Sequence, residues 1–95
     1  YNAVSPAWRK IVFQMDRPEV REIAVAGAKL LRDGAAKRPG TDWRFEYSPE
    51  TFSTAELDFS LEVCEAVMDV LRPTREKPII FNLPFFNDAA TTEIY

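Results

Sequence analysis

The chain of 95 residues contains no histidine and a single cysteine, Cys64. Without histidine it cannot form a histidine-based metal site, nor the Ser-His or Cys-His pairs that activate a nucleophile. One cysteine cannot build a disulfide framework within the chain. Cys64 lies on the apolar face of a predicted helix, so we expect a core residue rather than a reactive thiolate, which needs an accessible, electropositive setting. We therefore expect any metal of the protein to be held outside this sequence.

The chain also lacks an excess of basic residues and a long apolar run. Its formal net charge is -3, so it has no electrostatic footprint for nucleic acid. No apolar run approaches the roughly 18 to 20 residues that span a bilayer, and the first residues do not resemble a signal peptide. A content of 46% hydrophobic and 28% charged residues is typical of a globular domain. We expect a soluble, cytoplasmic protein with no nucleic-acid or membrane partner.

The two ends of the sequence predict that it is a segment of a longer protein. It begins at Tyr1 without an initiator methionine, and Tyr1-Asn2 resembles the end of a strand. It closes on residues 91–95, which resemble the first turn of a helix with threonine as its cap.

Three helices are predicted, and the first, from Ser5 to about Phe13, is short. The second begins at Asp16, which has proline in the first turn and Glu19 three residues on, the pattern of a capping box. The third begins after Ser53, which forms a second such pattern with Glu56. The expected buried stripe of the second helix is Val20, Ile23, Ala24, Gly27, Leu30 and Leu31, and that of the third is Leu57, Leu61, Cys64, Val67, Met68 and Leu71.

Two strands are predicted, at residues 43–49 and 79–84. In the first, Trp43, Phe45 and Tyr47 alternate with polar residues, which gives one aromatic and one polar face. The second is a nearly continuous apolar run, typical of a parallel strand covered on both faces. Arg44 and Glu46 share the polar face of the first strand, where we expect each to pair with the other or with a neighbouring strand.

Alternating helices and strands predict an α/β fold with parallel strands. Two strands alone bury too little surface for a stable sheet, which again favours a segment of a larger domain. An eight-unit barrel of about 250 residues would contain this chain as roughly a third of its length. We therefore predict that residues 1–95 are part of a single catalytic TIM-type (β/α)8 barrel domain.

Polar residues follow both predicted strands. Ser48 and Glu50 end the first, and Asn82 lies near the end of the second. The carboxyl ends of parallel strands form one face of such a fold, where active sites are assembled. A hydroxyl, a carboxylate and a carboxamide there could bind a small polar substrate and assist proton transfer. Taken singly, each residue is equally compatible with an ordinary turn or strand end.

Three ordered motifs carry a specific resemblance that covers essentially the whole chain. They are Tyr1-Asn2 with residues 9–13, then Pro-Gly-Thr-Asp-Trp-Arg-Phe-Glu-Tyr-Ser-Pro-Glu at 39–50, then Lys-Pro-Ile-Ile-Phe-Asn-Leu-Pro at 77–84. Together they resemble 2-isopropylmalate synthase. The resemblance implies a metal-dependent TIM-type barrel that condenses acetyl-CoA with 2-oxoisovalerate in leucine biosynthesis. It places the chain from just after the fourth barrel strand to the start of the helix after the sixth.

The resemblance also implies roles for individual residues. Ser48, Asn82 and Pro84 match positions that line the pocket for the 2-oxo acid, and Glu50 matches an acidic residue that supports catalysis beside the reacting centre. The divalent metal, Mg, Mn or Zn, is held in the family by an Asp-Arg-Asp-Gly-like motif and a His-x-His pair, which lie outside this chain. The parent enzyme is expected to be a homodimer, and the isolated chain is expected to be inactive.

One departure from the family pattern concerns substrate choice. After Asn-Leu-Pro the family usually continues Ala-Thr-Val-Glu, but here Phe85 and Phe86 follow. Phe86 at the threonine position would narrow the pocket and remove a hydrogen bond to the substrate carboxylate. A related synthase that uses another 2-oxo acid, of the homocitrate or citramalate type, is therefore an alternative. A further alternative is a non-catalytic α/β subunit or binding domain.

Overall fold

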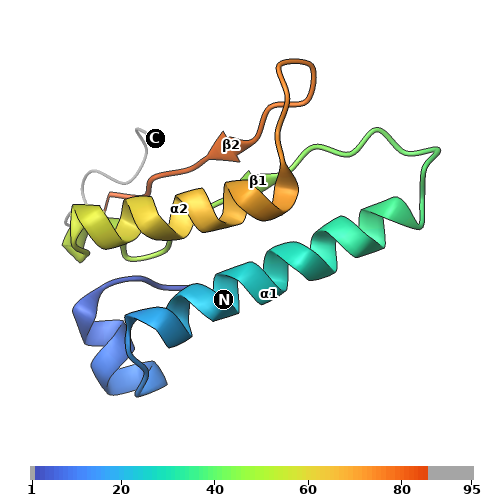
Figure 1. The fold of residues 1–95 in the computed structure, drawn as a ribbon. Coiled ribbons are helices and arrows are strands. Elements are labelled where there is room, and N and C mark those ends of the chain that lie inside the picture. Colours follow the sequence, from blue (N-terminus) through green and yellow to red (C-terminus); the bar gives the residue numbers. More distant parts are fainter. Residues whose placement is uncertain (1, 86–95) are drawn as a thin grey trace.

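The computed structural model describes residues 2–85 as a mixed α/β unit of two long helices and a short parallel sheet. The elements in chain order are the π-helix η1 (Trp8–Phe13), helix α1 (Arg17–Ala36), strand β1 (Glu46–Tyr47), the 3-10 turn η2 (Phe52–Thr54), helix α2 (Leu57–Leu71) and strand β2 (Ile80–Phe81). Figure 1 shows α1 and α2 side by side, with the strands next to α2. The threonine-capped helix expected at residues 91–95 lies outside the described residues.

Helix α1 begins as its sequence predicts. The Asp16 side chain accepts a hydrogen bond from the Glu19 amide at 2.9 Å, and the Glu19 carboxylate accepts one from the Asp16 amide at 3.1 Å. Two backbone donors of the first turn, which have no partner within the helix, are satisfied in this way. The capping box at Asp16 is therefore confirmed.

The buried stripe of α1 is confirmed only in the first half of the helix. Val20 and Ala24 are buried, together with Ala28, and they pack against α2. Leu30 and Leu31, by contrast, are 75% and 57% exposed. The reason is visible in Figure 1, where the carboxyl-terminal half of α1 extends past the end of α2. The prediction of one continuous buried face is wrong for this half within the described part of the chain.

Helix α2 buries a face that coincides only in part with the predicted one: Val67 is buried and Leu71 packs against the core, as expected. Its buried residues are Phe59, Ser60, Val63 and Val67. Leu57, Leu61 and Met68 of the predicted stripe are exposed, and Cys64 is half-buried rather than a core residue. The helix carries apolar side chains on two neighbouring faces, and contact with α1 selects the face of Phe59 and Val63. Burial raises the pKa of the Cys64 thiol, which disfavours the reactive thiolate.

The second predicted capping box is also wrong. Ser53 lies in η2, and Glu56 is the N-cap of α2 without a side-chain hydrogen bond to the helix. Its carboxylate pairs with two arginines instead. A bidentate contact with one guanidinium group and a further contact with a second give the carboxylate more charge-assisted hydrogen bonds than a single backbone amide would, so they determine where the Glu56 side chain lies.

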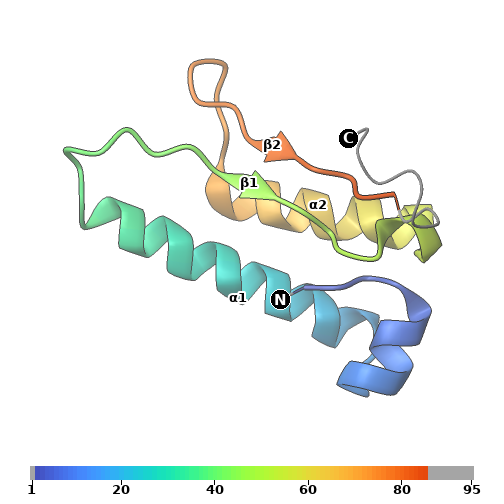
Figure 2. The ribbon, with the colours of Figure 1, turned by 180° about the vertical axis from the view of Figure 1, so that it is seen from behind.

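Strands β1 and β2 pair in parallel, with Glu46 opposite Ile80 and Tyr47 opposite Phe81. The regular ladder is shorter than the predicted strands. The alternation of faces is nonetheless confirmed, because Tyr47 and Ile79 pack on the core whereas Glu46 and Ile80 are exposed. Figure 2 shows both strands running in one direction along α2.

A third extended segment lies beside β1. Ala3 forms a parallel bridge with Glu50, in which the Val4 amide donates to the Glu50 carbonyl at 2.9 Å and the Glu50 amide donates to the Asn2 carbonyl at 3.0 Å. The first residues therefore pair like the end of a parallel strand, as the sequence predicts for Tyr1-Asn2. Tyr1 itself lies outside the described residues.

The expected pairing of Arg44 with Glu46 is not observed. The Arg44 guanidinium lies 2.6 Å from an Asp42 carboxylate oxygen, and Lys77 approaches the same oxygen at 3.8 Å. Both arginine and aspartate are exposed at the end of the sheet where the strands begin. Asp42 and Glu46 both lie two residues from Arg44, so either carboxylate can share its side of an extended chain, and the guanidinium pairs with Asp42.

Candidate functional site

The carboxyl ends of the two strands bring Ser48 and Asn82 together. The Asn82 side-chain amide donates a hydrogen bond to the Ser48 hydroxyl at 3.0 Å, and the Asn82 backbone amide donates to the Tyr47 carbonyl at 3.0 Å. The two residues are 34 positions apart in sequence and meet because β1 and β2 are parallel neighbours. The expected convergence of these two residues is therefore confirmed, whereas their roles as ligands of a substrate are addressed below.

Glu50 and Pro84 lie a little further along, where they line a common hollow. Its volume is about 460 Å³, and Ser5, Trp8, Thr51 and Phe85 also contribute to its wall. The hollow lies on the side of the sheet where both strands end. Its lining combines one carboxylate and several hydroxyls with aromatic rings, which suits a small ligand that has both polar and apolar parts. Phe86 lies outside the described residues.

The backbone is strained directly after Glu50. Thr51 has φ 60° and ψ 28°, the left-handed region that a β-branched residue rarely adopts. Its hydroxyl accepts a hydrogen bond from the Ser5 amide at 3.1 Å and donates one to the Glu50 carbonyl. Such strain costs on the order of 1 to 3 kcal/mol and persists only where surrounding contacts hold it. The turn is therefore fixed by contacts with the first residues of the chain.

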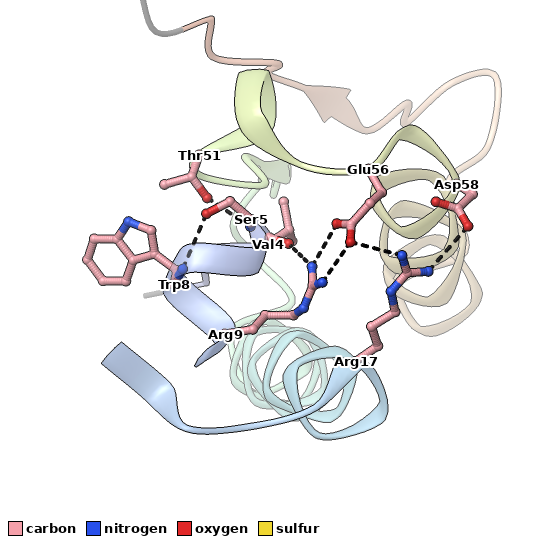
Figure 3. Close-up of polar contacts among 8 residues, drawn as sticks. All are labelled: Val4, Ser5, Trp8, Arg9, Arg17, Thr51, Glu56 and Asp58. Carbon is pink, nitrogen blue, oxygen red and sulfur yellow. Dashed lines mark hydrogen bonds and ion pairs between the residues drawn. The ribbon is translucent and has the colours of Figure 1, made fainter. Parts of the chain in front are cut away.

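Behind this turn lies a cluster of charged residues. The Arg9 guanidinium binds both carboxylate oxygens of Glu56, at 2.9 and 2.8 Å, and donates to the Val4 carbonyl at 2.6 Å. Arg17 approaches the same carboxylate at 3.0 Å and also contacts Asp58 (Figure 3). Hydrogen bonding from Arg9, with a further contribution from Arg17, holds the pKa of Glu56 at about 2. Both guanidinium groups also lie over the Phe59 ring.

No local sequence pattern predicts this cluster. Arg9 and Glu56 are 47 positions apart, and no local spacing links them. Arg9 is only 6% exposed although it lies in a short helix whose neighbours Lys10, Ile11 and Val12 are exposed. Thr51 was missed as well, because its left-handed conformation is not typical of threonine. These residues belong to the site's framework and are recognised only from the tertiary contacts.

Tyr47, the residue before Ser48, makes two side-chain contacts next to the site. Its hydroxyl donates a hydrogen bond to the Asn2 side-chain oxygen, and its ring meets the Phe81 ring edge-on with centroids 6.4 Å apart. Burial, together with the nearby Cys64 and Glu50, raises the pKa of Tyr47. The phenol therefore stays protonated and donates its hydrogen at neutral pH. It joins the first residues of the chain to the sheet rather than acting as a base.

Among residues 2–85 no three His, Cys, Asp or Glu side chains lie close enough together to hold a metal ion. Across the same residues, neither helix has the length and apolar character that crossing a membrane requires.

Comparison with known proteins identifies close relatives along the whole chain. The chain is 55% identical to a 2-isopropylmalate synthase of Pseudomonas savastanoi pv. phaseolicola, and 54% identical to proteins of the same name from Pseudomonas syringae pv. tomato and Ralstonia pickettii. Each match covers 100% of this chain and 17% of the relative. No protein-family profile matches the chain. An identity above one half over all 95 residues means that the chain belongs to the 2-isopropylmalate synthase family and corresponds to a segment of those enzymes, about a sixth of their length.

Proposed function

We propose that the whole protein containing this chain is an acyltransferase that condenses acetyl-CoA with 2-oxoisovalerate, as its relatives' name implies. In this Claisen-type reaction a C–H bond of the acetyl methyl group breaks, a base takes the proton, and the methyl carbon forms a bond with the keto carbon of the acid. The keto oxygen takes up a proton, and water cleaves the thioester to release free CoA. The observation that carries the proposal is the contact of Ser48 with Asn82 at the carboxyl ends of neighbouring parallel strands.

Within this reaction we assign Ser48, Asn82, Pro84 and Phe86 to the pocket for the 2-oxo acid. A hydroxyl and a carboxamide that already hydrogen-bond to each other are held in fixed positions, which favours a polar ligand at little entropic cost. Pro84 lies in the wall of the adjoining hollow. Phe86, two residues further along the chain, is assigned by its place in the family motif.

Glu50 is assigned to proton transfer beside the reacting centre. It lies in the same hollow as Pro84, and the strained turn at Thr51 fixes its backbone. A general acid or base must be positioned within hydrogen-bond reach of the proton it moves. A carboxylate on a backbone that is held on both sides, by Asn2 and by Val4, meets the requirement of a fixed position.

The fold that we propose for the whole domain is a TIM-type barrel, in which β1 and β2 are the fifth and sixth strands. Helix α1 precedes β1, and helix α2 connects β1 to β2. The parallel bridge between Ala3 and Glu50 adds a third extended segment to the sheet. Glu46, Ile80 and Asn82 would then face the interior. Polar groups at the carboxyl ends of the strands lie on the face where barrel enzymes carry their sites.

The divalent metal of the proposed enzyme belongs to residues outside this chain. The described side chains do not fit a metal ion, so no step is assigned to one here. We further propose a cytoplasmic homodimer whose partners are the two small-molecule substrates. This chain would supply the positions of the 2-oxo acid and of one proton-transferring carboxylate.

The test is release of free CoA from acetyl-CoA by the full-length protein with a divalent metal, across a panel of 2-oxo acids. We expect preference for 2-oxoisovalerate and a kcat lower by about 10²- to 10⁴-fold in Glu50→Gln, since general acid-base catalysis contributes about that much. Wild-type activity in the Glu50 variant would remove Glu50 from the reaction. No release with any 2-oxo acid would overturn the synthase proposal in favour of a non-catalytic subunit.

A second candidate is a related synthase that prefers a different 2-oxo acid, of the homocitrate or citramalate type. The observation that favours it is the pair Phe85 and Phe86 in place of the usual Ala-Thr. Phe85 lines the hollow beside Glu50 and packs edge-on against the Phe52 ring at 5.5 Å between centroids. The same panel of 2-oxo acids distinguishes the two candidates.

A further inference from the structure

Arg9 connects three separate stretches of the chain. It lies in η1, it donates to the Val4 carbonyl in the first extended segment, and it binds Glu56 at the start of α2 through two parallel hydrogen bonds (Figure 3). The guanidinium group is almost entirely buried, and Glu56 is about a third exposed. A bidentate pair of this kind fixes direction as well as distance, because the planar guanidinium fork matches the carboxylate.

The same contacts enclose the loop that carries Glu50. This loop leaves β1 at Tyr47 and reaches α2 at Glu56, so Arg9 holds its far end through the ion pair. Near its middle, the Glu50 carbonyl accepts a hydrogen bond from the Val4 amide, and the Val4 carbonyl accepts the bond from Arg9. A single side chain therefore holds both the end of the loop and the segment that pairs with Glu50.

The loop needs such support because of Thr51. A β-branched residue with φ 60° relaxes to a more favourable conformation unless its neighbours prevent it. Relaxation at Thr51 would turn the peptide that follows Glu50 and move the Glu50 side chain. Ser5 and Val4 oppose this movement directly, through their hydrogen bonds with Thr51 and Glu50. Arg9 opposes it indirectly, through its contacts with Val4 and Glu56.

We propose that Arg9 is a positioning residue for Glu50, acting through its ion pair with Glu56 and its hydrogen bond to the Val4 carbonyl. The consequence for activity depends on the proposed function, in which Glu50 transfers a proton. The consequence for the backbone does not depend on that function. The two consequences are therefore measured separately.

The first measurement is amide hydrogen exchange in the full-length protein for Glu56→Gln and for Arg9→Lys, a milder change that keeps the positive charge but loses the fork. Glu62→Gln is the matched control, because Glu62 lies on α2 and pairs with Arg21 of α1 at 3.3 Å without contacting the loop. We expect faster exchange of the peptides containing Val4 and Glu50 in both test variants and no change in the control. Unchanged exchange in both test variants would overturn the proposal.

The second measurement is a double-mutant cycle on CoA release with Glu56→Gln and Glu50→Gln. Misplacement of a catalytic group by about 1 Å lowers rates on the order of a hundredfold, so we expect Glu56→Gln to lower kcat by about 10- to 100-fold with less effect on KM. In the Glu50→Gln background it should lower kcat no further. Equal losses in both backgrounds would show a general structural effect and overturn positioning. A wild-type protein that releases no CoA would overturn the proposed function alone, while hydrogen exchange still decides the proposal for the backbone.

Discussion

At the scale of the single residue, Glu56 shows how a tertiary contact changes the chemistry of a side chain. The carboxylate lies between the guanidinium groups of Arg9 and Arg17, which form its main hydrogen bonds. These contacts lower its pKa from 4.5 to about 2. A carboxyl group whose pKa is lower in the folded state stabilises that state when it is ionised. Its contribution is fully present above about pH 4.5 and is lost as the pH falls toward 2.

We therefore predict that Glu56→Gln lowers the thermal midpoint of the full-length protein at pH 7 and that the difference from wild type shrinks as the pH falls below 4.5. The physical reason is that below about pH 4.5 the unfolded state binds a proton at Glu56 that the ion-paired carboxylate of the folded state does not, so the ion pairs stabilise the folded state less as the pH falls toward 2. Thermal unfolding in parallel buffers between pH 3 and pH 7 measures the difference. A difference that stays constant over this range would contradict the role of the Glu56 charge.

In the proposed enzyme, Phe86 is assigned to the pocket for the 2-oxo acid and is expected to influence substrate choice. In the family a threonine hydroxyl takes its place, and a hydrogen bond to a charged group contributes about 1 to 3 kcal/mol. We predict that Phe86→Thr in the full-length protein raises kcat/KM for 2-oxoisovalerate, measured as CoA release. Ile11→Thr is the control, because Ile11 is exposed and does not line the hollow. Unchanged or poorer kinetics in Phe86→Thr would count against a place for Phe86 in the pocket.

At the scale of the element, the helix pair α1 and α2 is the framework on which the site is built. The core comprises buried side chains from both helices and from the first segment: Val4, Val20, Ala24, Ala28, Phe59, Val63 and Val67. Phe59 is fully buried and also lies under the two guanidinium groups of the charged cluster. It therefore joins the apolar core to the ion pairs behind the Glu50 loop.

We predict that Phe59→Ala destabilises the protein by about 3 to 5 kcal/mol, the cost of truncating a fully buried aromatic side chain. Part of the loss comes from the contacts of the ring with Arg9 and Arg17. Phe59→Leu is the matched variant, because it fills most of the space but cannot form the cation–π contacts. Chemical denaturation of both variants measures the change in unfolding free energy. A loss below about 1 kcal/mol for the alanine variant would contradict the observed burial.

At the scale of the whole molecule, the described chain has more apolar surface than it covers. Leu57, Leu61 and Met68 of α2 form, with Phe81 and Leu83, an apolar groove of about 420 Å³. Large exposed apolar patches of this kind are typical of surfaces that contact another part of a protein. The proposed barrel accounts for the groove, because helices in such a fold pack against their neighbours on both sides.

The groove yields a prediction for the full-length protein. Leu61 is 60% exposed in the described chain, so truncation here would cost little if the surface stayed open. We predict instead that Leu61→Ala destabilises the full-length protein by about 2 to 5 kcal/mol, as expected for a buried leucine. Asp69→Ala, an exposed residue of α2 that does not line the groove, is the control. A negligible loss in unfolding free energy for the leucine variant would contradict a covering element.

The 95 residues by themselves are predicted to lack a stable fold and to release no CoA from acetyl-CoA. Within residues 2–85 the sheet has two strands of two residues each, and an isolated pair of strands is marginal in water. Thermal unfolding followed by circular dichroism, together with the CoA assay on the isolated chain, tests this. A cooperative transition would contradict the expectation for the fold, and CoA release would contradict it for the activity.

The sequence determined the elements whose signals are local. The start of α1 follows from Asp16 and Glu19, because a capping box satisfies backbone donors within four residues. The alternation of faces in β1 and β2 follows from the period of an extended chain, and it predicted that Ser48 and Asn82 would meet. The family followed from motifs spread over the chain.

Only the tertiary structure decided which apolar face of α2 is buried and where Glu56 points. Both faces of α2 carry large apolar side chains, so periodicity does not choose between Phe59 with Val63 and Leu57 with Leu61. Contact with α1 makes the choice. In the same way, Glu56 fits a local capping pattern, but the buried Arg9, 47 residues away, offers two charge-assisted hydrogen bonds. Interactions between distant residues outweigh local preferences where charge or core packing is involved. Such interactions cannot be predicted from a local sequence pattern.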